Sequence, residues 1–329
     1  ARFPGELAKV TGGDTPGPAS IVTVRRPADG GSWSRSEADR LAMLSQAMSE
    51  EGFDYVDLEL DLAESPEGRR LAESARSTGT RIIRSVHDFE GMPDDLARLY
   101  EDLSVREDEI PKLAVTPRSS ADLLVLVGLL LDSGPRERII IGMGAVGFPT
   151  RVAARRLGGY LSYVSASSNP DVAAAPGHVT PRVLAETYRY REQSPDTAIF
   201  GIIGNPVLHS ASPEYHNRHF REKNLDAVYV PFQVDDLDAF FDTAVRLDIR
   251  GLSVTVPHKE GVIAHLNETD ESVVPVGACN TVLITDGHRR GLNTDVPGFL
   301  LPLERAIGAS GPEAFDGMRA TVIGAGGAA

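Results

Sequence analysis

Short runs rich in β-branched residues alternate with longer amphipathic stretches along residues 20–191, and this alternation constrains the fold more than any other feature. Parallel strands need a crossover between them, usually a helix, so the pattern predicts an α/β fold with a parallel sheet. The expected strands are Ser20–Val24, Asp54–Leu60, Arg81–Val86, Lys112–Val115, Arg138–Gly142 and Tyr160–Val164. A closed (β/α)₈ barrel takes eight such units and an open doubly wound sheet takes fewer, so both architectures stay open.

Helix signals separate these runs. Ser34–Glu51 begins with a Ser-Arg-Ser-Glu sequence similar to a capping box. Ser119–Leu131 is apolar almost all round, as a buried helix is. Pro181–Arg191 has proline at its first position and Thr180 as the expected N-cap.

The pattern is interrupted at residues 193–197, which we interpret as a linker, and then restarts. We therefore expect domains at 1–192 and 198–318, followed by the start of another at 319–329. The expected elements of the second part are strands Ala198–Ile203, Tyr229–Val234 and Gly251–Val256, a helix from about Ser212, and a hairpin of Cys279–Thr285 with Arg289–Leu292 around Asp286-Gly287.

Composition excludes several classes of function. The net charge of −14 argues against nucleic acid or an anionic membrane as a partner. The longest apolar run, Leu123–Leu131, is too short for a bilayer, which takes roughly 20 residues. Cys279 is the single cysteine, so no intrachain disulfide forms, and a cytoplasmic location is expected. Without a cysteine cluster or an HxxxH pair, we expect no metal.

Lys112 and His87 are the first candidates for chemistry. Lys112 lies within the apolar run Ile110–Val115. Burial would lower the pKa of its amine and favour attack on a carbonyl, although a lysine at a strand start is more often exposed. His87 follows the strand Arg81–Val86, at the end where a barrel places its catalytic groups, although a histidine there is more often structural.

Three carboxylates share one face of the second expected strand, because Asp57, Glu59 and Asp61 alternate with apolar residues. On an edge strand they would be solvated, but inside a barrel they would need partners. Arg25 and Arg151 could serve as those partners, or could bind an anionic substrate through paired hydrogen bonds.

Together these residues resemble the type I 3-dehydroquinate dehydratases over about residues 20–190. The motifs that carry the resemblance are Thr23-Val24-Arg25, Tyr55–Leu60, Ser85–Phe89, Pro111–Ala114, Gly142–Arg151 and Ala175-Pro176-Gly177. The resemblance implies a (β/α)₈ barrel, here incomplete with about six β/α units. It also implies that Lys112 forms an imine with the substrate ketone and that His87 removes a proton and helps to expel a hydroxyl.

The resemblance assigns supporting roles as well. Glu59 would orient His87, Arg151 would bind the substrate carboxylate, and Arg25, Met143 and Tyr163 would lie against the substrate. The sequence differs from the family pattern in the loop that closes over the substrate. There, Ala174 and His178 stand where the family has a serine and a glutamine. His178 could partly replace the glutamine as a substrate contact. Nothing in the sequence matches the first two strands of the family, so we expect a fragment at the N-terminal end.

The second part resembles the substrate-binding domain of shikimate dehydrogenase over about residues 198–299. Its motifs are His209–Pro213, Ser253–Lys259, Gly277–Val282 and Gly291–Asp295. The resemblance implies that Ser210 and Ser212 bind a carboxylate, that Thr255, Asn280 and Asp295 hold hydroxyls, and that Lys259 and Asp295 form the catalytic pair. By themselves, the two serines also fit a helix N-cap and a turn.

The last residues resemble the start of a dinucleotide-binding domain. A short apolar run, Thr321–Ile323, leads into a turn whose Gly324, Gly326, Gly327 and Ala328 would bind NADP. The first part is expected to need no cofactor. The expected ligands are the small molecules 3-dehydroquinate, 3-dehydroshikimate and shikimate.

The joined order resembles bifunctional dehydratase–dehydrogenases of the shikimate pathway, a lyase and an oxidoreductase of aromatic amino acid biosynthesis. Two alternatives stay open. One is a different lysine–imine barrel, such as an aldolase, joined to an unrelated α/β domain. The other is a noncatalytic module that retains shikimate binding.

Overall fold

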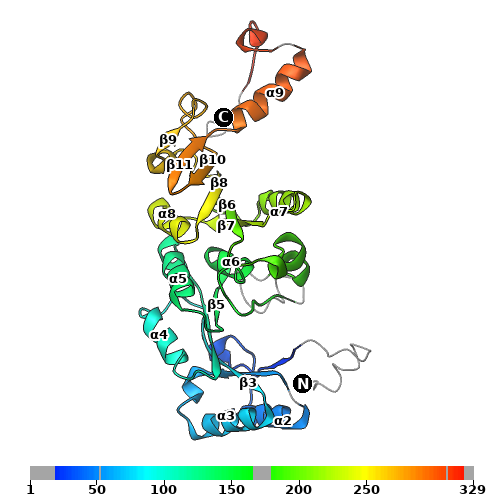
Figure 1. The fold of residues 1–329 in the computed structure, drawn as a ribbon, viewed down its shortest axis with the longest axis vertical. Helices are drawn as coiled ribbons and strands as arrows, with labels where there is room; N and C mark the ends of the chain where they lie inside the picture. Colours follow the sequence, from blue (N-terminus) through cyan, green and yellow to red (C-terminus); the bar gives the residue numbers. More distant parts are fainter. Residues whose placement is uncertain (1–18, 52, 166–178, 309, 322–329) are drawn as a thin grey trace, which may run out of the picture. The chain divides into compact units, whose positions relative to one another are not determined.

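The computed structural model describes residues 19–51, 53–165, 179–308 and 310–321 (Figure 1). The chain divides into two compact units. Unit 1 contains residues 1–117, 129–163 and 171–178, and unit 2 contains 118–128, 164–170 and 179–329. The expected NADP-binding residues 324–328, and with them Ala174 to His178, lie outside the described residues.

Unit 1 is built on a five-stranded parallel sheet whose strands neighbour one another in chain order. This order is the one that successive β/α units of a barrel produce. The strands are β1 (Ile21–Val22), β2 (Tyr55–Glu59), β3 (Arg81–Asp88), β4 (Glu109–Val115) and β5 (Ile139–Gly142). The α/β class and the parallel sheet are thus confirmed, and the described strands form an open sheet that does not close on itself.

Helices cover one face of this sheet. They are α2 (Glu37–Glu51), α3 (Pro66–Thr78) and α4 (Leu96–Leu103), whose first residues are capped by Asp95. Helix α6 (Gly144–Val152) follows β5. Val56 and Leu58 of β2 are fully buried in one cluster with Leu44 of α2 and Leu71 of α3. The alternation of β2 therefore leaves Asp57 on the other face.

The opposite face has its own apolar cluster. Ile83, Ile110 and Ile139 contribute from successive strands, and Tyr160 and Tyr163 pack against them. This is the face of β3 and β4 that carries Ser85 and Lys112, because side chains two residues apart point the same way. The side chain of Lys112 is therefore surrounded by protein on the sheet face that lacks α2 and α3.

Two expectations for unit 1 and its neighbourhood were wrong. Residues 160–164 are not a strand: the Tyr160 amide donates to the carbonyl oxygen of Arg138, 2.8 Å, but no ladder follows among the described residues. The helix expected over 181–191 is broken into a π-helical turn, Val183–Thr187, and a 3₁₀ turn, Tyr190–Glu192. Arg189, between them, has a φ of 49°, which ends a right-handed helix.

The sheet of unit 2 has six strands in the order β7-β6-β8-β10-β11-β9. The strands are β6 (Ala198–Gly204), β7 (Ala227–Gln233), β8 (Ile249–Val254), β9 (Glu268–Thr269), β10 (Thr281–Thr285) and β11 (His288–Leu292). The predicted hairpin of β10 and β11 is confirmed. Both of its turn residues, Asp286 and Gly287, have positive φ angles, 51° and 78°, as a tight hairpin turn requires.

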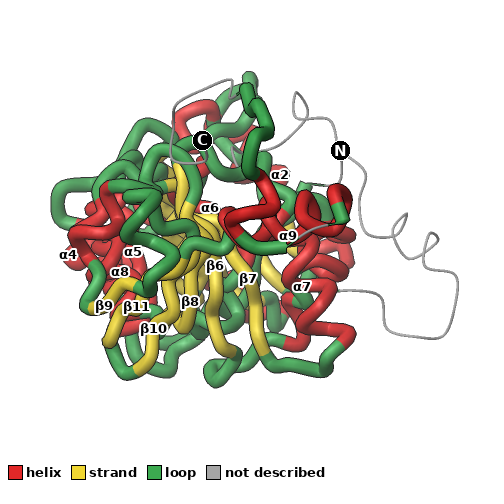
Figure 2. The backbone as a smooth tube through the Cα atoms, turned by 90° about the horizontal axis from the view of Figure 1, so that it is seen from above, coloured by secondary structure: helices red, strands yellow, loops and turns green. Residues whose placement is uncertain are grey.

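Helices α7 (Ser212–Glu222) and α8 (Leu237–Arg246) flank this sheet (Figure 2). The ring of His216 in α7 stacks on that of Tyr229, with the ring centres 4.3 Å apart, whereas Phe240 of α8 packs on Phe232. Because Tyr229 and Phe232 are an odd number of residues apart on β7, the two helices cover opposite faces. Helix α5 (Ser120–Asp132) is divided between the two units, and its Ser120 bonds to Asp235 within unit 2.

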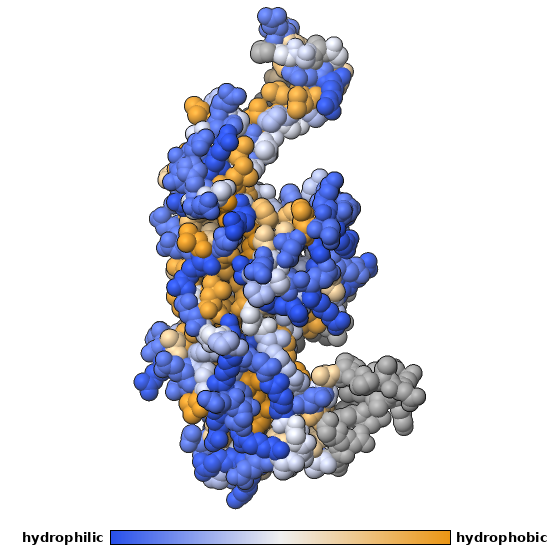
Figure 3. All heavy atoms as spheres, viewed as in Figure 1, coloured by the Kyte–Doolittle hydropathy of each residue, from blue (hydrophilic) through white to orange (hydrophobic). Residues whose placement is uncertain are grey.

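Helix α9 (Asp295–Ile307) has no buried residue within the part of the chain that the structure describes. Apolar side chains are visible on it in Figure 3, and Phe299 is 69% exposed. No helix of the described ranges is long and apolar enough to cross a membrane.

Gly147 offers a test of packing in unit 1. A Cβ at this α6 residue would lie 2.3 Å from the backbone carbonyl carbon of Gly142, so Gly147→Ala must push α6 off β5. We expect a loss of about 1–3 kcal/mol in the free energy of unfolding, measured by denaturant titration. Gly298→Ala in α9, where a Cβ meets nothing within 4 Å, is the matched control and should be neutral or slightly stabilising. Equal stability of the two variants would contradict the packing described here.

Candidate functional site

The carboxyl ends of the unit 1 strands bring the predicted residues to one edge of the sheet. His87 lies near the end of β3, and Lys112 lies on the neighbouring β4. Lys112 is in register with Ser85, so His87 is one pleat repeat closer to the strand ends on the same face. Met143 follows β5 directly and is buried, with its amide donating to Val115, 2.7 Å.

Lys112 is held by Asp57, one of the three carboxylates of the second expected strand, to which the sequence assigned no catalytic role. Its Nζ lies 2.6 Å from Oδ2 of Asp57, and both side chains are 3% exposed. The hydroxyl of Ser85 donates to the other carboxylate oxygen of Asp57, and Arg25 lies 3.3 Å from Oδ2. Asp57 and Lys112 come from β2 and β4, so they meet across the small Ser85 side chain of β3.

Tyr163 completes the surroundings of the amine. Lys112 Nζ is 4.5 Å from the centre of the Tyr163 ring, a distance at which the ring face attracts a cation. Among the residues that the structure describes, the buried hydroxyl of Tyr163 has no hydrogen-bond partner, and neither buried ring nitrogen of His87 has one. Orphaned polar atoms are costly in a folded protein, so this cluster is built to receive a polar ligand or water.

The electrostatics of the site suit a nucleophile and a base. Burial lowers the pKa of Lys112 below its ordinary value, and Asp57 opposes this only in part. Burial would raise the pKa of Asp57, but the charges of Lys112 and Arg25 hold it below its usual value. Burial, together with the charges of Lys112 and Arg25, lowers the pKa of His87 to about 3, so the imidazole is neutral at pH 7.

Glu59 lies elsewhere than the sequence suggested. Both of its carboxylate oxygens accept from Nη1 of Arg40, 3.0 Å each. Arg40 belongs to α2, and its side chain is fully buried. The expected contact with His87 is therefore not present, since neither ring nitrogen of His87 has a partner. Glu59 is the last residue of β2, and at that position its carboxylate pairs with the buried guanidinium of Arg40. Sequence gave no signal for Arg40, which belongs to an ordinary amphipathic helix.

Arg151 is also more enclosed than a substrate-binding arginine needs to be. It is 1% exposed, and its Nη1 donates to the carbonyl of Tyr163, 3.0 Å. Burial lowers the pKa of Arg151 to about 10, and its buried Nε has no partner. Arg151 thereby positions the segment that carries Tyr163, and the unpartnered Nε remains for another acceptor.

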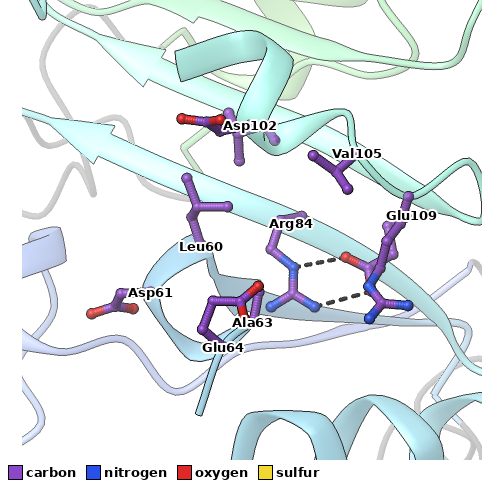
Figure 4. Close-up of a pocket in the computed structure, with 10 residues that line it drawn as sticks. Leu60, Asp61, Ala63, Glu64, Arg84, Asp102, Val105 and Glu109 are labelled. Carbon is purple, nitrogen blue, oxygen red and sulfur yellow. Dashed lines mark hydrogen bonds and ion pairs between the residues drawn. The ribbon is translucent and has the colours of Figure 1, made fainter. Parts of the chain in front are cut away.

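Two hollows lie near these residues. One, of about 750 Å³, has His87, Phe89 and Gly30 among its lining residues. The other, of about 370 Å³, surrounds the buried pair Arg84–Glu109 (Figure 4). Arg84 alternates with Ser85, so this second hollow lies on the sheet face away from Lys112. Its central charges satisfy each other, and we do not assign chemistry to it.

Unit 2 brings a second lysine and carboxylate together. Nζ of Lys259 lies 2.6 Å from Oδ2 of Asp295, and the side chains are 14% and 46% exposed. Lys259 follows β8 and Asp295 begins α9 after β11. The Asn293 side chain accepts from the Asp295 amide, 3.0 Å, and this bond fixes the start of α9.

The sheet topology explains why these residues meet. Strand β10 runs antiparallel to β8 and β11, so its beginning adjoins their ends. Asn280 therefore lies beside Val254, and its backbone carbonyl accepts from the Val254 amide, 2.7 Å. The side-chain amide of Asn280 donates to the hydroxyl of Thr294, 2.9 Å. Thr255 follows β8 at the same edge, and its amide donates to Ile203 of β6, 3.0 Å.

The two predicted serines begin α7 at the end of β6. The hydroxyl of Ser210 accepts from the amide of Ser212, 3.2 Å, and both residues are partly exposed. This bond is the turn interaction that the sequence left open as an alternative. It leaves the Ser212 hydroxyl available at the helix start, where amide groups favour anions. Carboxylate binding by these serines stays a prediction.

The fold and the sites define a chain of two α/β parts, each with a lysine–carboxylate pair at the ends of its strands. The family model described as type I 3-dehydroquinase matches residues 6–195. A second model, described as the shikimate dehydrogenase substrate binding domain, matches residues 202–282. The chain therefore belongs to the type I 3-dehydroquinase family and carries a shikimate dehydrogenase substrate-binding domain after it.

Known proteins are similar to the whole of this chain or to its second part. The bifunctional 3-dehydroquinate dehydratase/shikimate dehydrogenase of Arabidopsis thaliana, a chloroplastic protein, is 32% identical over 94% of this chain and 52% of its own. A shikimate dehydrogenase (NADP(+)) of Pyrococcus furiosus is 42% identical over 40% of this chain and 47% of its own. The solved dehydroquinate dehydratase and shikimate dehydrogenase of S. pombe AroM is 26% identical, with a TM-score of 0.42, over 87% of this chain and 55% of that one. This chain thus spans about half the length of these relatives.

The neutral state of His87 predicts how stability depends on pH. An unfolded histidine has a pKa near 6.5, whereas that of folded His87 is about 3. Between these values the unfolded chain binds a proton that the folded chain does not, so the free energy of unfolding falls as the pH decreases. We expect His87→Asn to reduce this slope between about pH 6.5 and pH 4, measured by denaturant titration. His288→Asn, at a half-exposed histidine, should keep the wild-type slope. An unchanged slope in His87→Asn would contradict a buried neutral imidazole.

Proposed function

We propose that this chain acts in the shikimate pathway through two sites: a dehydratase site in unit 1 and a shikimate-binding site in unit 2. The observation that carries the proposal is the buried Lys112 amine, held between Asp57 and Tyr163, with the neutral His87 on the neighbouring strand. A lysine with a lowered pKa and a nearby base is the combination that imine chemistry needs. The membership in the type I 3-dehydroquinase family supports 3-dehydroquinate as the ketone.

In the proposed dehydration, Nζ of Lys112 attacks the ketone carbon of 3-dehydroquinate and water leaves as the imine forms. The imine draws electrons from the neighbouring carbon, so a proton there becomes acidic. His87 accepts that proton and returns it to the hydroxyl on the next carbon, which leaves as water. Hydrolysis of the imine then releases 3-dehydroshikimate and restores the lysine. The position of His87 on β3, beside Lys112 on β4, supports these steps.

In unit 2, Lys259 and Asp295 would bind 3-dehydroshikimate or shikimate at the reacting oxygen, with Lys259 Nζ holding the proton that the oxygen receives or returns. Thr255 and Asn280 would hold hydroxyls, and Ser210 and Ser212 the carboxylate. NADPH would supply the hydride in the complete reaction, and the names of the similar dehydrogenases support NADP as the cofactor. The residues proposed to bind it, 324–328, are not described, so no step is assigned to them.

Domain boundaries at 192 and 198, with 193–197 as the linker, also form part of this proposal, and the two family matches on either side of that segment support them. A cytoplasmic location stays a prediction from the single cysteine.

Borohydride trapping tests the dehydratase site. After incubation with 3-dehydroquinate and reduction, mass spectrometry should find one adduct, on Lys112. Lys112→Met should form none, because the amine is gone. Lys223→Met, at the exposed end of α7, should trap as wild type does. A wild-type protein that gives no adduct, yet binds shikimate, would refute the dehydratase site and leave a binding module.

Calorimetric titration with shikimate tests the second site without any cofactor. Loss of a hydrogen bond to a charged group costs about 1.5–3 kcal/mol, so Lys259→Met should weaken binding by roughly tenfold or more. Ser212→Ala should weaken it as well if the hydroxyl meets the carboxylate. The Lys223→Met control should bind as wild type does. Wild-type affinity in Lys259→Met would show that shikimate binds elsewhere or in another way.

A further inference from the structure

Among the described residues, Lys112 has a single anionic partner in direct contact, the Asp57 carboxylate at 2.6 Å, and this carboxylate belongs to strand β2. Ser85 donates to one of its oxygens, and Arg25 lies 3.3 Å from the other. Asp57 and Lys112 are each 3% exposed in their side chains, so water screens their attraction very little. An ion pair this enclosed acts on whatever chemistry occurs at the lysine nitrogen.

We propose that Asp57 is a further catalytic residue, the counter-ion of the Lys112 nitrogen both as the free ammonium and as the protonated imine formed with the substrate. The proposal rests on the dehydratase function proposed above and adds a role that neither Glu59 nor His87 fills. Asp57 contacts the reacting nitrogen itself.

Charge conservation shows why one carboxylate serves both states. The ketone and the ammonium combine to give a protonated imine and water, so one positive charge is present on the same nitrogen before and after. On the way, the Asp57 carboxylate accepts one ammonium proton and frees the lone pair that forms the C–N bond. The carbonyl oxygen takes up two protons in total and leaves as water while the nitrogen lone pair forms the C=N bond. The last N–H proton of the imine then points to the same carboxylate.

The surroundings decide that Asp57, and not another acid, does this. The groups that face Lys112 are Asp57, Arg25, the more distant Glu59, the neutral His87 and the ring of Tyr163. Arg25 is positive and opposes the cation, and Glu59 is already bonded to Arg40. The Tyr163 face stabilises a cation but takes no proton. Asp57 is therefore the one carboxylate among the described residues in contact with the amine.

The test uses cyanoborohydride, which reduces the protonated imine and not the neutral one. The full chain is incubated with 3-dehydroquinate across a pH series, and the Lys112 adduct is measured by mass spectrometry. The trapping limit is the highest pH at which the Lys112 adduct still forms. Removal of the counter-ion disfavours a positive nitrogen, so in Asp57→Asn this limit should move to lower pH by more than about one unit. Turnover, followed by the ultraviolet absorbance of the conjugated product, should fall by at least about a hundredfold.

Two further variants separate this role from a structural one. Asp57→Glu keeps the charge and displaces it, so it should lose rate while its trapping limit stays within about half a pH unit of wild type. It also keeps the proposal testable if Asp57→Asn fails to fold. Asp108→Asn, at an exposed residue just before β4, removes a carboxylate of the same size and should match wild type throughout.

The outcomes are distinct. No adduct in wild type would overturn the dehydratase site and this proposal with it. A normal adduct in wild type, with the same pH limit and turnover in Asp57→Asn, would overturn the counter-ion alone. The proposal would also be overturned if the trapping limit of Asp57→Glu moved as far as that of Asp57→Asn. It would be overturned as well if the limit of Asp57→Glu moved and that of Asp57→Asn did not, because the charge would then not be the cause.

Discussion

The buried ion pair of Asp57 and Lys112 is the interaction on which unit 1 depends. Two charges that leave water lose several kcal/mol each, and only close contact with further hydrogen bonds restores that loss. The contact exists because β2, β3 and β4 lie side by side in a fixed register, with the small Ser85 between the two charged residues. A shift of one residue in any of these strands would turn a charge into the apolar face under α2 and α3. The register of the sheet and the chemistry of the site are therefore one constraint.

The site in unit 2 follows a different physical logic. Lys259 and Asp295 also lie 2.6 Å apart, but Asp295 is 46% exposed, so water screens the pair. Their meeting depends on the mixed sheet, in which the antiparallel β10 brings Asn280 to the edge where β8 and β11 end. An open pair of this kind suits a group that must exchange a proton with a bound hydroxyl, whereas the enclosed pair of unit 1 suits a nitrogen that is positive before and after imine formation and needs a fixed counter-ion. The two lysines thus differ in environment as the two proposed reactions require.

Local patterns predicted much of this fold. Five of the six strands expected in unit 1 are present, and the Asp286-Gly287 turn forms the hairpin that its residue types demand. Arg25 is a partner of Asp57, one of the two possibilities that the sequence left open. The run 160–164 has a strand composition but no partner for its backbone among the described residues, and a strand is defined by pairing and not by composition. The helix at 181–191 ended early because Arg189 adopts a left-handed conformation that nothing in its residue type foretells.

The sequence by itself determined the α/β class, the positions of most strands, the presence of Lys112 in a strand, and the presence of His87, Lys259 and Asp295 near strand ends. It could do so because alternation and strand-end position are local properties of the chain. Only the tertiary structure decided which carboxylate serves which cation. Asp57 and Glu59 share a face and differ by one pleat repeat, yet Asp57 meets Lys112 and Glu59 meets Arg40. That choice depends on residues brought together from β3, β4 and α2. The spacing of residues along β2 gives no information about their distances from residues of those elements.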